Sequence, residues 1–164
     1  MANQQLAYLS LGSNLGDPIE QIVSARQAIY EWQFTDAGRC SFLYVSSPVG
    51  YEHQADFVNC VLQIRTSAQP QQLLQFCQTL ELNLGRERDP GNQNAPRTID
   101  IDILVMDKQI VDQSNLILPH PRMNQRLFVL LPLLDLLHGD DAQVIQDIIE
   151  QGDFRNQAIY RLAV

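Results

Sequence analysis

The chain has 164 residues, 45% of them apolar, and this length and composition favour one globular domain, residues 1–164, over two. Its net charge of −8 repels nucleic-acid and membrane phosphates, so we expect no nucleic-acid or membrane partner. The three cysteines lie in apolar runs, which is typical of buried thiols in a reducing compartment. With no signal peptide and no apolar run long enough to span a bilayer, we expect a cytoplasmic protein. We also expect a monomer.

The negative charge is unevenly distributed along the chain. Residues 86–126 hold six basic and six acidic side chains, so the whole net charge lies outside this stretch. Half of the ten arginines lie within it: Arg86, Arg88, Arg97, Arg122 and Arg126. Guanidinium groups match phosphate oxygens in geometry and in charge, so this stretch is a candidate site for a small phosphate-containing ligand.

The first half of the chain predicts alternating strands and helices. Residues 7–11 predict a strand, and turn formers at 12–18 lead into a helix whose apolar stripe covers residues 19–32, with an exit at Gly38. Residues 40–47 and 57–66 are rich in β-branched and aromatic residues and predict two strands. Gln69-Pro70 opens a second helix, which Gly85 closes.

The second half predicts a loop, one strong strand and two helices. Residues 86–96 have no apolar period and predict an exposed, mobile loop. Residues 98–106 predict the clearest strand, followed by a hairpin return at 109–111 and by helices at 126–137 and 142–150. This order is the split βαβ arrangement of an α+β, ferredoxin-like sandwich, with a mainly antiparallel sheet, helices on one face and the other face uncovered.

Two carboxylates share one face of the strand predicted at 98–106. The apolar set Ile99, Ile101, Ile103 and Val105 faces the core, which places Asp100 and Asp102 on the opposite face, about 6.6 Å apart along the strand. Such a pair is repulsive unless a cation lies between its members, and oxygen ligands favour Mg²⁺ over zinc. Two solvated charges are the alternative, but the apolar strand and the preceding Arg97 favour a metal-bound phosphate.

The strand at 57–66 carries a second pattern. Its core-facing set is Val58, Cys60, Leu62 and Ile64, which leaves Phe57 and Asn59 together on the other face. An aromatic ring beside an amide can stack on a planar heterocycle and hydrogen-bond its edge. Packing of Phe57 under a loop, with Asn59 capping a turn, is an alternative that this segment alone leaves open.

Several common ligand-binding motifs are absent, and one histidine lies between two prolines. The sequence has no Walker phosphate loop, no Gly-x-Gly-x-x-Gly fingerprint and no zinc-ligand spacing. Pro119-His120-Pro121 holds a histidine in an extended loop, where it can donate to a phosphate.

Together these residues resemble the 6-hydroxymethyl-7,8-dihydropterin pyrophosphokinase family of folate biosynthesis over nearly the whole chain. The segments that carry the resemblance are 11–16, 47–50, 56–59, 81–86, 96–103 and 119–128. The resemblance implies a ferredoxin-like enzyme that uses ATP and two Mg²⁺ ions. It implies transfer of the β,γ-diphosphate to the pterin hydroxymethyl oxygen, with release of AMP.

The resemblance also implies roles for individual residues. The implied metal ligands are Asp100 and Asp102, which with Arg86 and Arg97 form the implied catalytic set. The implied ATP contacts are Gln78, Glu81, Arg86, Arg88, Arg97, Ile103, His120 and Arg126. The implied pterin contacts are Ser46, Ser47, Val49, Phe57, Asn59 and Phe128, with the two rings on either side of the pterin. The loop 86–96 is then expected to close over ATP and exclude water.

Three positions depart from the family pattern. Asn94 stands where many members have a tryptophan, Pro121 where an aromatic residue is common, and Asn115 where some members have an arginine. We expect these departures to change substrate affinity more than reaction type.

Two other functions are weighed against this one. A nucleotidyltransferase has a Gly-Ser pair close to its Asp-x-Asp, whereas 88 positions separate Gly12 from Asp100. Its by-product is pyrophosphate rather than AMP. A ferredoxin-like binding module gives no reason for paired carboxylates among clustered arginines.

Overall fold

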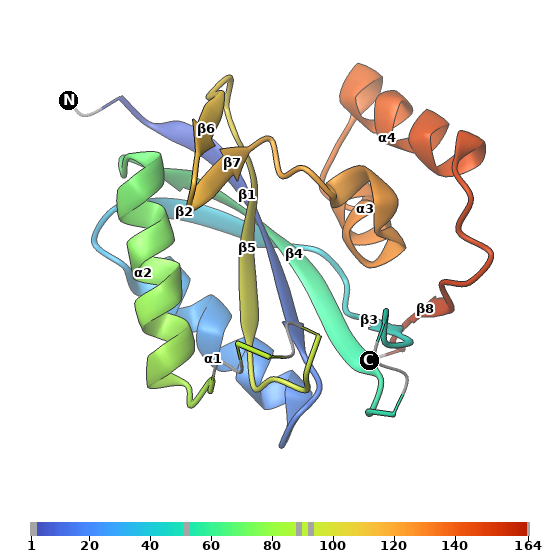
Figure 1. The fold of residues 1–164 in the computed structure, drawn as a ribbon. Helices are drawn as coiled ribbons and strands as arrows, with labels where there is room; N and C mark the ends of the chain where they lie inside the picture. The colour runs from blue at the N-terminus through green and yellow to red at the C-terminus, as the bar shows by residue number, and fades with distance from the viewer. Residues whose placement is uncertain (1–2, 51–52, 88–89, 92–93, 164) are drawn as a thin grey trace.

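The computed structural model describes residues 3–50, 53–87, 90–91 and 94–163. Its main sheet is antiparallel and has the order β5-β1-β4-β3-β8, with β2 also paired to β4 (Figure 1). The strands are β1 (Gln5–Ser13), β2 (Thr35–Cys40), β3 (Tyr44–Ser46), β4 (Phe57–Thr66), β5 (Asp100–Met106) and β8 (Ile159–Arg161). Because β1 lies between β4 and β5, the two strands with functional patterns are separated by a single strand.

Helices α1 (Pro18–Glu31) and α2 (Pro70–Asn83) pack on one face of this sheet. Pro18 begins α1, where the Asp17 side chain accepts a hydrogen bond from the Glu20 amide at 3.1 Å. The main core under the two helices combines their apolar stripes with the inward residues of β1, β4 and β5. These contacts confirm the α+β, split βαβ fold class.

One detail of the predicted architecture is wrong, because the second sheet face is not left bare. Helix α3 (Leu127–Leu134) lies on that face, and helix α4 (Gly139–Gln151) packs against α3 (Figure 1). Their apolar residues form a second core cluster with Val61 of β4 and Leu104 of β5. Helix α3 has the sequence LFVLLPLL, which is apolar on every side and therefore favours burial. The uncovered part of this face lies beside these helices, and it carries the candidate site.

The region between α1 and β4 differs from the prediction. The strand expected at 40–47 is two short strands, β2 and β3, which both pair with β4. Gly38 lies within β2 and does not mark the helix exit, since α1 ends at Glu31. A Cβ atom at Gly38 would overlap the ring of Tyr30, so the glycine allows α1 to approach the strand closely.

The expected hairpin also has different partners. Strand β6 (Val111–Gln113) pairs with β7 (Leu116–Leu118) in a separate two-stranded sheet, and a 3-10 turn at Met123–Gln125 precedes α3.

Strand β5 changes its alternation after Ile103. The register with β1 pairs Leu9 with Ile103 and Tyr8 with Val105, so Leu104 is an extra residue in β5. Leu104 and Val105 consequently belong to the cluster under α3 and α4, and the expectation that Val105 shares the face of Ile103 is wrong. The carboxylates lie before this irregularity, so their placement opposite Ile99, Ile101 and Ile103 is confirmed.

The three cysteines are free thiols, with Cys60 and Cys77 buried and Cys40 partly buried, as expected. Within the described ranges, no helix combines the length and the apolar character needed to cross a bilayer.

Candidate active site

A cavity of about 780 Å³ lies over neighbouring positions of β1, β4 and β5, the strands that carry Gly12, Asn59 and Asp100. Its walls are the loop between β3 and β4, the loop between α2 and β5, and the segment that leads into α3. Twelve predicted site residues line it: Ser46, Ser47, Val49, Phe57, Asn59, Arg86, Arg97, Asp100, Asp102, His120, Arg126 and Phe128. Residues far apart in the sequence therefore meet in one place.

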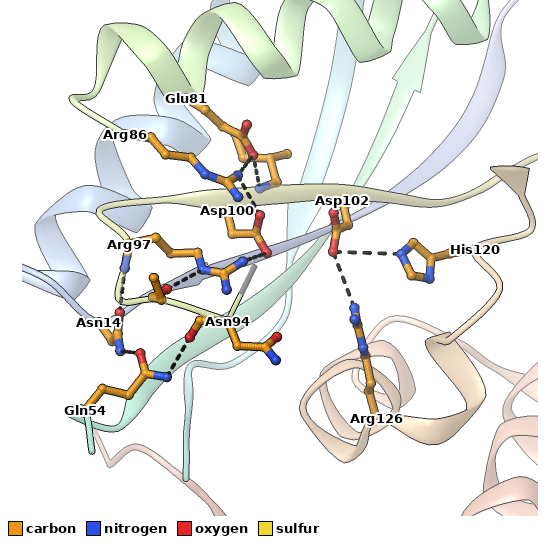
Figure 2. Close-up of polar contacts among 12 residues, drawn as sticks. Asn14, Gln54, Glu81, Arg86, Asn94, Arg97, Asp100, Asp102, His120 and Arg126 are labelled. Atoms are coloured by element: carbon orange, nitrogen blue, oxygen red, sulfur yellow. Dashed lines mark hydrogen bonds and ion pairs between the residues drawn. The ribbon is translucent and has the colours of Figure 1, made fainter. Parts of the chain in front are cut away.

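Asp100 is held by two arginines on its two oxygens (Figure 2). The Arg86 guanidinium donates to Oδ1 at 2.6 Å, and the Arg97 guanidinium donates to Oδ2 at 3.2 Å. Both arginines come from the loop between α2 and β5, so the loop and the strand form one charged unit. Charge-assisted hydrogen bonds of this kind fix guanidinium groups in the cavity wall.

Glu81, near the end of α2, orients Arg86 from behind. The Glu81 side chain is 3% exposed, and its Oε1 accepts hydrogen bonds from the Arg86 guanidinium at 2.5 Å and from the Ile101 amide at 2.7 Å. The second bond satisfies an amide on the free edge of β5. Glu81 thus joins the helix, the strand and the arginine without lining the cavity.

Asp102 lies two residues further along β5, and its carboxylate is less well compensated than that of Asp100. Its Oδ2 lies 3.5 Å from an Arg126 guanidinium nitrogen and 3.9 Å from Nε2 of His120. Desolvation and the nearby charge of Asp100 raise the pKa of Asp102 to about 7, although Arg126 acts in the opposite direction. The carboxylate pair therefore favours a bound cation.

His120 presents a defined nitrogen to the cavity. Its main-chain amide donates to Leu104 O at 2.8 Å, and its Nδ1 accepts from the Arg122 amide at 3.1 Å. Burial, together with the positive charges of Arg126 and Arg122, lowers the pKa of His120. Because Nδ1 is an acceptor, the neutral ring carries its proton on Nε2, which faces Asp102 and the cavity.

The other half of the cavity is aromatic and amide-lined. Asn59 is 3% exposed, and its amide donates to Ser46 Oγ at 2.8 Å. Phe57 lies with the Arg97 guanidinium carbon 5.8 Å from its ring centroid, and Phe128 has the same relation to Arg126 at 5.6 Å. The pairing of Phe57 with Asn59 on one face is therefore confirmed, and both border the charged half.

Gly12 keeps the floor between the two halves open. It pairs with Asn59 on one side and with Asp100 on the other. A Cβ atom at this position would lie 3.1 Å from Asn59 Oδ1, so a larger residue would displace the amide.

Three predicted contacts among the described residues do not line the cavity. The Ile103 side chain is buried in the main core, which leaves only its main chain for a contact with ATP. Gln78 and Glu81 lie on α2 outside the lining. The predicted contact at Arg88 falls outside the described residues.

The structure adds lining residues that sequence reasoning missed. Ser10 and Gln54 are examples, and Gln125 lies in the turn before α3. The predicted site residues also omit Asn14, whose side chain donates a hydrogen bond to Gln54. The alternation of β1 could have indicated Ser10, which pairs with Asp102. No pattern in the sequence indicates that Gln54 meets Asn14, because 40 positions separate them.

The donor set fits a hard divalent cation. Asp100 and Asp102 both line the cavity from one face of β5. Among the described residues, no three His, Cys, Asp or Glu side chains gather as a metal cluster. An ion held by two carboxylates takes its other ligands from water and substrate oxygens, which is the habit of Mg²⁺ at phosphate sites.

Comparison with known sequences gives a consistent family. The family model of 7,8-dihydro-6-hydroxymethylpterin-pyrophosphokinase (HPPK) matches residues 8–138. The 2-amino-4-hydroxy-6-hydroxymethyldihydropteridine pyrophosphokinase of Pseudomonas aeruginosa is 43% identical over 132 residues, which cover 80% of each chain. The protein of the same name from Bacillus subtilis is 40% identical over 131 residues, covering 80% of this chain and 77% of the relative.

Solved structures show the same fold. A Plasmodium falciparum HPPK-DHPS structure aligns with 92% of this chain at a TM-score of 0.67 and 14% identity. The alignment covers 46% of that structure's chain, so this chain spans about half of the two-enzyme protein. The family model and the two bacterial relatives each match most of the chain. The chain therefore belongs to the 7,8-dihydro-6-hydroxymethylpterin-pyrophosphokinase family.

Proposed function

We propose that ATP is the donor, that Mg²⁺ is required, and that the cavity transfers the β,γ-diphosphate of ATP with release of AMP. Family membership makes the chain a pyrophosphokinase that acts on 6-hydroxymethyl-7,8-dihydropterin in folate biosynthesis. The observation that carries the proposal is the junction of two unlike half-sites in one cavity. Arginines and carboxylates line one half, and two aromatic rings and an amide line the other.

Asp100 and Asp102 are the proposed metal ligands, and we propose two Mg²⁺ ions that arrive with ATP. Bound Mg²⁺ supplies neutralisation of the phosphate charge and orients the phosphate chain. Asp100 and Asp102 would hold the ions, since both side chains lie on the cavity face of β5.

The arginines exchange partners when substrate binds. Arg86 and Arg97 both contact Asp100 in the structure, at distances that neutralise its charge. A cation held by Asp100 would take over the neutralisation of its charge, and the two guanidinium groups would then be available to phosphate oxygens, which match their fork geometry. Arg126 lies beside Asp102 as Arg97 lies beside Asp100. Stabilising the charge of a transferring diphosphate requires groups that are already placed, and Glu81 keeps Arg86 in place.

The remaining side chains orient the reactants. Neutral His120 can donate from Nε2 to a phosphate oxygen, because its Nδ1 is occupied by the Arg122 amide. Phe57 and Phe128 are the proposed stacking rings, and Asn59 the proposed partner of the pterin amide edge. The loop of Ser46, Ser47 and Val49 forms the adjoining wall. With both reactants held, attack of the hydroxymethyl oxygen on the β-phosphorus becomes an intramolecular step.

Product analysis separates this function from its competitors. Incubation with ATP, Mg²⁺ and 6-hydroxymethyl-7,8-dihydropterin should give AMP on anion-exchange chromatography, and EDTA should abolish it. Asp102→Asn should lower the rate by orders of magnitude while the far-ultraviolet circular dichroism is unchanged. Release of pyrophosphate would instead indicate a nucleotidyltransferase, and pterin binding without turnover would indicate a binding module.

We also infer that the enzyme acts as a cytoplasmic monomer. One chain supplies both the arginine–carboxylate half and the aromatic–amide half of the described cavity, which supports a site built within a single subunit. The three free thiols suit a reducing compartment. Light scattering at working concentration should give the mass of one chain, 18.6 kDa.

A further inference from the structure

Asn14, the residue that follows β1, connects two loops that both line the cavity. It is 4% exposed, and its side-chain amide is used at both ends (Figure 2). Its Oδ1 accepts from the Arg97 amide at 2.9 Å, while its Nδ2 donates to Gln54 Oε1 at 2.8 Å and to Ala55 O at 3.0 Å. These partners lie 83, 40 and 41 positions away in the sequence. A residue that only capped its own turn would bond its neighbours.

On the phosphate side, the contact is a two-point clamp on the backbone of Arg97. Besides the side-chain bond, the main-chain N–H of Asn14 donates to Arg97 O at 3.1 Å. The guanidinium of the same residue contacts Asp100 Oδ2 at 3.2 Å and lies over the ring of Phe57. Asn14 therefore fixes the main chain from which the Arg97 side chain extends into the cavity.

On the pterin side, the connection continues through Gln54 into the loop before β5. Gln54 Nε2 donates to Asn94 O at 2.8 Å, and Gln54 itself lines the cavity. Asn94 in turn lies against Gly50, where a Cβ atom would come within 2.8 Å of Asn94 Nδ2. The loop that holds the proposed pterin wall and the loop that holds Arg97 thus touch through amide groups, at the position where many family members carry a tryptophan.

We propose that Asn14 is a positioning residue that fixes the pterin-side loop and Arg97 relative to each other through its bond to Gln54. This inference rests on the proposed function, because it assigns the two loops to the two substrates. Asn14 does not itself line the cavity, so it acts through Arg97 and Gln54. Asn14 acts on the alignment of the two substrates. Without its bonds, Arg97 and the loop that carries Gln54 can move independently, and a 1 Å misplacement can reduce a rate by about 100-fold.

Charge-neutral variants test the connection. Asn14→Ala should lower kcat by about 100-fold and raise the KM for the pterin. Gln54→Ala breaks the same bond but leaves Asn14 on the Arg97 main chain, so it should raise the KM for the pterin and lower kcat by a smaller factor. Because the two residues act through one bond, the double variant should be less impaired than the product of the single effects. Asn3→Ala and Gln75→Ala remove exposed amides elsewhere and should leave both constants unchanged.

A conservative variant separates the two ends of the Asn14 side chain. Asn14→Asp keeps an acceptor for the Arg97 amide and removes the donor to Gln54. It should retain more kcat than Asn14→Ala, while its KM for the pterin rises as far. A residue that merely stabilised the fold would show no such split between the two constants.

Amide hydrogen exchange provides a readout independent of turnover. In Asn14→Ala, peptides covering residues 53–58 and 94–98 should both exchange faster, with β4 and α2 unchanged. Independent behaviour of the two loops, strictly multiplicative kinetic effects or an unchanged kcat in Asn14→Ala would overturn the proposal. If the parent protein releases no AMP, the proposed function fails instead, and the exchange data still decide whether Asn14 joins the loops.

Discussion

At the residue scale, Asp102 combines an unfavourable environment with a favourable position. The side chain is 35% exposed to the cavity, yet protein surrounds it and Asp100 lies beside it. Desolvation and this neighbouring charge bring its pKa to about 7. A side chain placed only for stability would be paired more closely than Asp102 is with Arg126, at 3.5 Å. The arrangement is expected where a cation completes the site.

This raised pKa predicts how stability depends on pH. The native state holds a proton on Asp102 between about pH 4 and pH 7, where the unfolded state has lost it, so ionisation destabilises the metal-free fold as the pH rises through that range. Asp102→Asn removes this effect. Without metal, its Tm should exceed that of the parent by about 2 °C at pH 8 and equal it at pH 4, as scanning calorimetry can measure. An equal Tm at both pH values would contradict the assignment.

Arg97 is predicted to contribute through geometry as well as charge. Arg97→Ala removes a placed donor from the phosphate side and should lower kcat by about 10² to 10³. Arg97→Lys restores the charge without the planar fork, so steady-state kinetics should show only partial recovery. Full recovery with lysine would mean that charge alone is needed.

At the scale of elements, β5 shows what sequence alternation can and cannot predict. Alternate apolar residues predict the face of Asp100 and Asp102 correctly, because strand periodicity is a local property. The inserted Leu104 reverses this periodicity for Val105, and the register depends on the pairing with β1. The position of Arg86 beside Asp100 likewise depends on Glu81, whose contact with the Ile101 amide forms only after α2 docks.

Glu81 is therefore predicted to affect stability and activity together. Glu81→Ala leaves the Ile101 amide without its acceptor, which should lower the free energy of unfolding by about 1–3 kcal/mol in urea titrations. Glu81→Gln retains an oxygen for that amide and should recover most of the stability. It should recover less of the activity, because a neutral amide holds the Arg86 guanidinium more weakly. Equal loss of both properties in the two variants would argue against this role.

At the scale of the whole molecule, the net charge of −8 and a polyanionic substrate are compatible. The charge disfavours a broad surface for nucleic acid, but the described cavity lining combines Arg86, Arg97, Arg122 and Arg126 with Glu87, Asp100 and Asp102. The sequence predicted the fold class and the charge-neutral stretch. It did not predict α3 and α4 on the second face, because an apolar helix does not reveal which surface it covers.

This charge balance predicts that metal and nucleotide bind together. A non-hydrolysable ATP analogue with Mg²⁺ should raise the Tm more than the sum of the shifts from each alone, because the cation relieves the carboxylate repulsion and the arginines then meet phosphate. Differential scanning fluorimetry with and without EDTA measures this. Equal shifts in the presence of EDTA would show that the nucleotide binds without metal.

The central claim is the transfer of a diphosphate unit from ATP to the pterin. Phosphorus NMR of the protein with Mg²⁺, ATP and 6-hydroxymethyl-7,8-dihydropterin follows every phosphorus atom at once. The account predicts that the ATP resonances decline while those of AMP and of a pterin diphosphate ester appear in equal amounts. Pyrophosphate in place of AMP, or an unchanged ATP spectrum, would contradict it.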